Sequence, residues 1–226
     1  MPTSSVAHLS VGASSGRDAF VAQTRRFLAA AEALDDHALL SASRCHGWAV
    51  LDVVVHVRAG LEEMLRGATA PTELAPTVDA ATYWSAWTEA EDRGAVVDGI
   101  LWTRRTASAY RRPITAVKHL RDAAEAIIDA ASRLSAPAVA FQGHVLATGD
   151  FLATWAVELA VHHVDMGREL DVGLPSGTAL QLTRRTVSAL LGVAVPDDIT
   201  DLEALLIGSG RTAAPDDRHP VRRVLG

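Results

Sequence analysis

Residues 152–164 read LATWAVELAVHHV, an almost unbroken apolar run that nevertheless contains Glu158, His162 and His163. A segment that is apolar on every face is typical of a buried helix. A carboxylate taken out of water is costly unless a positive charge or a hydrogen-bond donor meets it. The chain must therefore fold so that another part of it, or a bound group, supplies a partner for Glu158.

Apolar periodicity predicts five helices, at about residues 18–34, 50–67, 117–134, 151–170 and 178–192. The β-branched residues 50–57 also fit a strand, but the pattern continues to Leu65, so its length favours a helix. We expect residues 82–116 to be partly helical, with Pro113 as a kink or break. Residues 135–150 read as a connector that can hold a short extended piece, and Asp150 is placed to cap the next helix.

The expected fold is all-α: a four-helix bundle with accessory helices and a short mixed carboxyl-terminal segment. With 49% hydrophobic residues, the chain has ample material for such a core. Three parts are predicted: a flexible tail at 1–16, a metal-binding helical bundle at 17–170, and a helix with an extension at 171–226 that packs on the bundle.

Composition narrows the kinds of partner. A net charge of -6 disfavours an extended nucleic-acid surface, because phosphate binding needs clustered positive charge. No apolar run is long enough to span a bilayer, and the first residues lack the features of a secretory signal. The single cysteine, Cys45, rules out an internal disulfide framework. We therefore expect a cytoplasmic monomer or homodimer that binds neither nucleic acid nor membrane.

Glu158 and His162 are four residues apart, so they project from one face of a helix. His56 interrupts a second apolar helix in the segment DVVVHVRAG. Two imidazoles and one carboxylate leave coordination positions open on zinc or a similar divalent ion, and a bundle can bring such side chains together. This pattern predicts a single metal ion held by His56, Glu158 and His162. The alternative is that the histidines are hydrogen-bonded core residues.

Two neighbours of His162 have different predicted roles. His163 lies five positions from Glu158 and is expected to face elsewhere. Asp165, three positions after His162, can orient the imidazole as an acceptor or can be a solvated residue near the helix end. The residues alone leave these two alternatives for Asp165 open.

Two segments resemble a known family. RCHGWAVLDVVVHVRAG resembles the CPGW(T/S)VxDVVxHL segment of the DinB-like superfamily, in its mycothiol-dependent branch that includes maleylpyruvate isomerase, and GDFLATWAVELAVHHVD resembles the later ExxxHxxD helix. The likeness covers about residues 17–170. It implies a bundle with a divalent metal, often zinc, on His56, Glu158 and His162. It also implies mycothiol as the low-molecular-weight thiol cosubstrate.

The resemblance predicts a metal-dependent, mycothiol-using thiol transferase or isomerase that acts on a small electrophilic metabolite. The nucleophile would be the thiolate of the cosubstrate, activated by the metal. A metal-dependent hydrolase that uses bound hydroxide and a metal-free helical binding protein are the alternatives. About 55 residues follow residue 170, fewer than the carboxyl-terminal domain of maleylpyruvate isomerase, which argues against that specific isomerisation.

Other residues are candidates of a weaker kind. His46 replaces the proline of the family segment and could act as an acid or base beside the mouth of the bundle. Ala49 replaces the usual Ser or Thr, which removes a capping hydroxyl worth about 1 kcal/mol. Trp155 either lines a cavity or fills the core. Arg104 and Arg105 either bind carboxylates of a ligand or form a solvated helix face.

Overall fold

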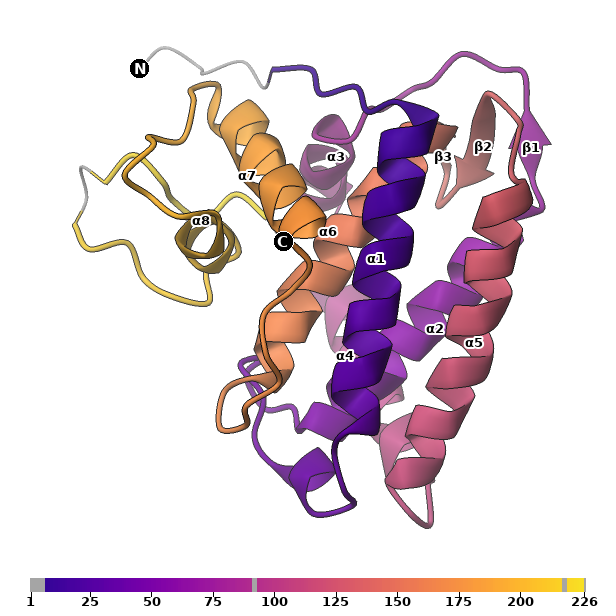
Figure 1. Cartoon of the computed structure of the whole chain (residues 1–226), viewed down its shortest axis with the longest axis vertical. Helices are drawn as coiled ribbons and strands as arrows, with labels where there is room; N and C mark the ends of the chain where they lie inside the picture. Colours follow the sequence, from indigo (N-terminus) through magenta and orange to yellow (C-terminus); the bar gives the residue numbers. More distant parts are fainter. Residues whose placement is uncertain (1–6, 91–92, 217–218, 226) are drawn as a thin grey trace.

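The computed structural model describes residues 7–90, 93–216 and 219–225, and most of these residues are helical. Four long helices form a bundle: α1 (Ala13–Glu32), α2 (Val50–Ala68), α5 (Ile114–Arg133) and α6 (Thr148–Met166). In this bundle α1 packs against α5 and α6, and α2 packs against the same two helices (Figure 1). The predicted all-α bundle is confirmed.

Further helices surround the bundle. They are a short 3-10 helix, η1 (Ala38–Leu40), and α3 (Thr82–Ala90), α4 (Arg93–Ser108), α7 (Gly177–Leu191) and α8 (Asp201–Gly208). Helix α4 packs on α2, whereas α7 packs on α1 and α6 and carries α8 on its outer side (Figure 1). Pro113 separates α4 from α5, so the predicted break is confirmed. Ala49 is the N-cap of α2 and makes no side-chain cap.

A small antiparallel sheet closes one end of the bundle, with the order β1 (Pro71–Thr72), β2 (Ala138–Phe141) and β3 (His144–Ala147). Strands β2 and β3 form a hairpin whose turn residues, Gln142 and Gly143, both have positive φ. A two-residue turn of this kind matches the twist of the flanking strands. The extended piece that the connector was expected to hold is therefore this hairpin.

The amino-terminal segment and Asp150 differ from the sequence-based prediction. Helix α1 begins at Ala13, so residues 13–16 are helical rather than part of a tail, and residues 1–6 lie outside the described residues. The prediction that Asp150 caps α6 is wrong, because the N-cap is Ala147 and Asp150 lies inside the first turn. Its carboxylate instead accepts the backbone N–H of Val11 at 2.7 Å. The partition at residue 170 stays a prediction.

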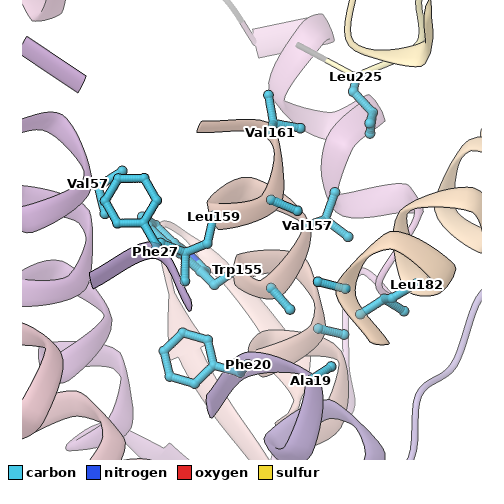
Figure 2. Packing of buried hydrophobic residues seen from close by; sticks show 14 of the residues in the cluster. Ala19, Phe20, Phe27, Val57, Trp155, Val157, Leu159, Val161, Leu182 and Leu225 are labelled. Carbon is cyan, nitrogen blue, oxygen red and sulfur yellow. The ribbon is translucent and has the colours of Figure 1, made fainter. Parts of the chain in front are cut away.

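Helix α6 is buried on all sides, and Glu158 is its one partly exposed residue. One side of the helix contributes Leu159 and Trp155 to the packing around Phe27 in α1, while Val157 and Val161 lie on the side toward α7 and the carboxyl-terminal segment (Figure 2). Residues 152–164 are apolar on every face because other parts of the protein cover both sides of α6. Within the described residues, no helix is long and apolar enough to cross a membrane.

Candidate metal centre

Three donor atoms from two helices converge between α2 and α6. Oε1 of Glu158 lies 3.0 Å from Nε2 of His162 and 3.5 Å from Nε2 of His56. The ligand atoms of the three residues all lie within 4.8 Å of one another, and the two imidazole rings are 4.7 Å apart at their centroids. The structure thus brings together the three residues chosen from the sequence, although His56 and Glu158 are 102 positions apart.

A close helix contact beside this cluster sets the spacing of α2 and α6. Gly60 lies one turn after His56, and Trp155 lies one turn before Glu158. A Cβ atom on Gly60 would be 2.6 Å from Cζ3 of Trp155, so only glycine lets the indole lie against α2. The indole also meets the Phe141 ring of the hairpin, 6.3 Å away at the centroids. Trp155 is buried and fills the contact between α2 and α6.

The charges of the cluster are matched within it. Burial raises the pKa of the Glu158 carboxyl, but the charge and hydrogen bond of His162 outweigh burial and hold that pKa well below its usual range. Burial lowers the pKa of His162, yet the charge of Glu158 and the hydrogen bond to Asp165 raise it well above 6.5. The carboxylate is therefore balanced by an imidazolium proton, whose place a metal ion can take.

Asp165 is fully buried and orients His162. Its Oδ2 atom lies 3.0 Å from Nδ1 of His162. Arg211 donates to both carboxylate oxygens, from Nε to Oδ1 and from Nη2 to Oδ2, each at 2.9 Å. Burial raises the pKa of Asp165, but these partners outweigh it and hold the pKa well below normal. Asp165 is therefore an orienting acceptor and not a solvated residue, and it keeps the proton on Nδ1 so that Nε2 faces Glu158.

A second group of possible ligand atoms comprises Cys45, His162 and Asp165, again within 4.8 Å of one another. Both oxygens of Asp165 already accept hydrogen bonds from Arg211. The guanidinium Nη2 also lies 3.7 Å from Sγ of Cys45, and its positive charge opposes a second cation there. The group of His56, Glu158 and His162 is consequently the better metal site.

The sequence model of the mycothiol maleylpyruvate isomerase N-terminal domain family matches residues 20–167 of this chain. That match covers well over half of the sequence and includes α2 and α6, the helices that carry the three candidate ligands. The chain belongs to this family. Comparisons with curated proteins and with solved structures returned no match. Membership of the mycothiol maleylpyruvate isomerase family confirms the resemblance on which the sequence-based prediction was built.

The residues present fit a divalent ion of the kind that the family implies. The cluster offers two imidazole nitrogens and one carboxylate oxygen, a donor set suited to zinc and similar ions. Exposed fractions of the side chains are 37% for His56, 24% for Glu158 and 8% for His162. The site therefore opens toward solvent on the His56 side, where an external ligand can enter. That these three residues bind a metal stays a prediction.

The remaining candidates lie outside this cluster. His46 is exposed in the turn before α2, and Arg104 and Arg105 are exposed on α4. Among the described residues, no hydrogen bond or ion pair joins any of these three to the ligand cluster. His163 faces away, as predicted, with Nε2 lying 3.1 Å from the carbonyl oxygen of Val172.

Sequence reasoning missed one residue of this centre, Arg211. It lies in the segment after α8, 46 positions from Asp165. Its surroundings, GSGRTAAPDD, are those of an ordinary polar loop and carry no spacing signal. The one available hint was Asp165 itself, because a carboxylate next to a buried histidine requires a second donor.

Proposed function

We propose that this protein is a metal-dependent enzyme that uses mycothiol to attack a small electrophilic metabolite, as an S-transferase or an isomerase. The observation that carries the proposal is the convergence of His56, Glu158 and His162 on one point at the surface between α2 and α6. Membership of a family named for a mycothiol-dependent isomerase supports the choice of thiol.

His56, Glu158 and His162 would hold the ion, with zinc as the first choice for nitrogen and oxygen ligands. A divalent ion bound there would stabilise the thiolate form of the cosubstrate over the thiol at neutral pH. The protein's own residues prepare the site. Glu158 supplies the negative charge, and Asp165 holds the Nδ1 proton of His162 so that Nε2 is free to donate its lone pair.

The exposure of His56 gives the cosubstrate a path. The side chain of His162 is almost fully covered, whereas that of His56 is more than one-third exposed. An incoming thiol would therefore approach along α2, past His56. The electrophile would have to bind on the same side, since α1 and α7 cover the opposite sides of α6.

Two measurements on the purified protein test the proposal. Elemental analysis is expected to find one equivalent of a divalent metal, and absence of metal would defeat this function and favour a metal-free binding protein. Incubation with mycothiol and a simple alkylating electrophile is expected to give protein-dependent formation of the thioether. Hydrolysis of an ester substrate without any thiol adduct would favour the hydrolase instead.

Variants of the ligands make the test specific. His56→Ala and His162→Ala are expected to abolish both the metal content and the thiol-dependent activity. His119→Ala is a matched control, because His119 is an exposed imidazole on α5 that bonds to Tyr110. Loss of activity in the control, or its retention in both ligand variants, would count against the proposal.

A further inference from the structure

We propose that the loop at residues 41–49, between η1 and α2, positions both histidine ligands of the proposed metal centre. Cys45 acts on His162 through Asp165, and Trp48 acts directly on the ring of His56. Cys45 and Trp48 are thus positioning residues and not ligands. This inference rests on the metal centre proposed above, and it assigns a role to two residues that the proposed chemistry does not use.

The loop is held rigidly by bonds within itself. The backbone N–H of Trp48 donates to the carbonyl of Cys45 at 3.0 Å, and that of Ser43 donates to the carbonyl of Trp48 at 3.0 Å. The buried hydroxyl of Ser43 accepts the N–H of Cys45 at 3.1 Å. Gly47 has φ of 76°, which suits the third position of a tight turn and is strained for other residues. The separation of Cys45 and Trp48 is therefore fixed.

The same loop is bound to the end of the helix that carries Glu158 and His162. The backbone N–H of Arg44 donates to the carbonyl of Asp165 at 2.9 Å. The Arg44 side chain donates from Nε to the carbonyl of Val164 at 3.0 Å. Since the loop also leads directly into α2 at Val50, it joins the two ligand helices at the end nearest the site.

The first arm of the loop is the thiol of Cys45. Its Sγ donates to Oδ2 of Asp165 at 3.1 Å. The same oxygen accepts from His162 Nδ1 at 3.0 Å and from Arg211 Nη2 at 2.9 Å. With three donors around one oxygen, the carboxylate is held from three directions. Without the thiol, this oxygen keeps only the donors from His162 and Arg211, so the position of the carboxylate against the imidazole is less tightly set.

The second arm is the indole of Trp48. Its ring lies 5.3 Å from the ring of His56, centroid to centroid, with 57° between the planes. Among the described residues, no hydrogen bond reaches Nδ1 of His56, in contrast to Nδ1 of His162. On one side the His56 ring meets the ring of His162, 4.7 Å away at the centroids. The contact with Trp48 adds a second ring against the imidazole and helps to keep Nε2 directed at Glu158.

Metal titration of single variants tests this proposal, with cobalt(II) as a spectroscopic probe and zinc in competition. Loss of an orienting partner of a metal-ligating histidine costs about 10–100-fold in metal affinity. Cys45 acts one step further from the ion, so Cys45→Ala is expected to weaken binding about tenfold, at the lower end of that range, and to change the visible cobalt spectrum. Cys45→Ser keeps a hydroxyl donor and is expected to recover most of the affinity.

Trp48 is tested in the same way. Trp48→Leu is expected to weaken metal binding and alter the cobalt spectrum, whereas Trp48→Phe keeps a ring and is expected to retain most of both. Trp102→Leu is the matched control, because Trp102 is half-exposed on α4. Thermal unfolding of the metal-free variants separates positioning from general stability, because a merely structural role would lower the melting temperature and leave the cobalt spectrum unchanged.

The outcomes distinguish this proposal from the proposed function. If the wild-type protein binds no cobalt or zinc, the metal centre itself is refuted. If the wild type binds one ion and both Cys45→Ala and Trp48→Leu match its affinity and spectrum, the metal centre stands and the role of the loop is refuted. Equal losses in Cys45→Ser and Cys45→Ala, with an unchanged spectrum, would likewise overturn the hydrogen-bonding role of Cys45.

Discussion

Replacing Gly60 with alanine is expected to harm both stability and metal binding, although alanine is the better helix former. Gly60 lies inside α2, and the indole of Trp155 occupies the space that a Cβ at this position would take. An added Cβ would lie 2.6 Å from Cζ3 and 3.3 Å from Cζ2 of that ring, and nearer still to Cη2. Distances below 3.0 Å are not found for real Cβ atoms, so the indole or a whole helix must move.

Two opposing free energies decide the size of this effect. The change from glycine to alanine inside a helix gains about 1 kcal/mol in helix propensity. Forcing an extra methyl group into a packed contact costs about 1–3 kcal/mol. The expected net result for Gly60→Ala is a loss of up to about 2 kcal/mol in the free energy of unfolding.

Gly99→Ala is the control for this experiment. Gly99 lies in α4, and a Cβ added there meets nothing within 4 Å. It is expected to gain about 0.5–1 kcal/mol, so the difference between the two variants isolates the cost of the clash. Urea unfolding of the metal-free proteins measures both values. If Gly60→Ala is stabilised as much as Gly99→Ala, the close contact of α2 with Trp155 is wrong.

The same substitution tests the link between this contact and the site. His56 and Glu158 each lie one turn from the Gly60–Trp155 contact, so a shift that makes room for the methyl group moves the ligands apart. Zinc affinity of Gly60→Ala is therefore expected to fall, and that of Gly99→Ala to stay at the wild-type value. An unchanged zinc affinity together with clear destabilisation would show that the clash is relieved away from the ligands.

Three further predictions concern stability. Burial, with a smaller contribution from Asp79, raises the pKa of Asp150 to about 6. The folded protein therefore binds this proton more tightly than the unfolded chain does, and the resulting stability is lost as the pH rises from about 4 to about 6. The loss is at most about 3 kcal/mol before solvent screening reduces it. Asp150→Asn should remove this pH dependence, as measured by urea unfolding at pH 4 and 7. A variant that is less stable than the wild type at pH 7 would contradict this. His46→Pro should raise stability by about 0.4–1 kcal/mol in thermal unfolding, since proline suits the position before Gly47; destabilisation would refute that reading. A chelator should remove about 2.7 kcal/mol from protein held at a hundredfold excess of zinc over its dissociation constant, and an unchanged melting temperature would argue against the metal.

The grouping of His56, Glu158 and His162 could be predicted because the signals for it lie within single helices. Glu158 and His162 share a face by helical spacing alone, and the apolar residues around them and around His56 mark both helices as buried. In a four-helix bundle, polar side chains on two buried helices have few positions that keep them away from each other. The fold class was predictable for the same reason, since five helix positions follow from periodicity within each segment.

The errors occur where a distant segment decides the outcome. Asp150 satisfies every local rule for a cap, but strand β3 leads directly into α6 at Thr148, and the carboxylate then bonds to Val11, 139 positions away. For the hairpin at 138–147 the sequence predicted only a short extended piece, because four-residue strands are too short to show a periodicity. For Asp150, a contact with a distant segment overrides a weak local preference.

The site joins these two kinds of information. Its three candidate ligands and Asp165 follow from local spacing, but the partners of Asp165 come from elsewhere: Cys45 is 120 positions from Asp165, and Arg211 is 46 positions away. A histidine can be recognised as a candidate ligand from its own helix, yet its tautomer and direction depend on what the rest of the chain places against its other nitrogen. Residues that tune the affinity of such a centre should therefore be sought among loop residues that contact the candidate ligands' partners, as well as along α2 and α6 themselves.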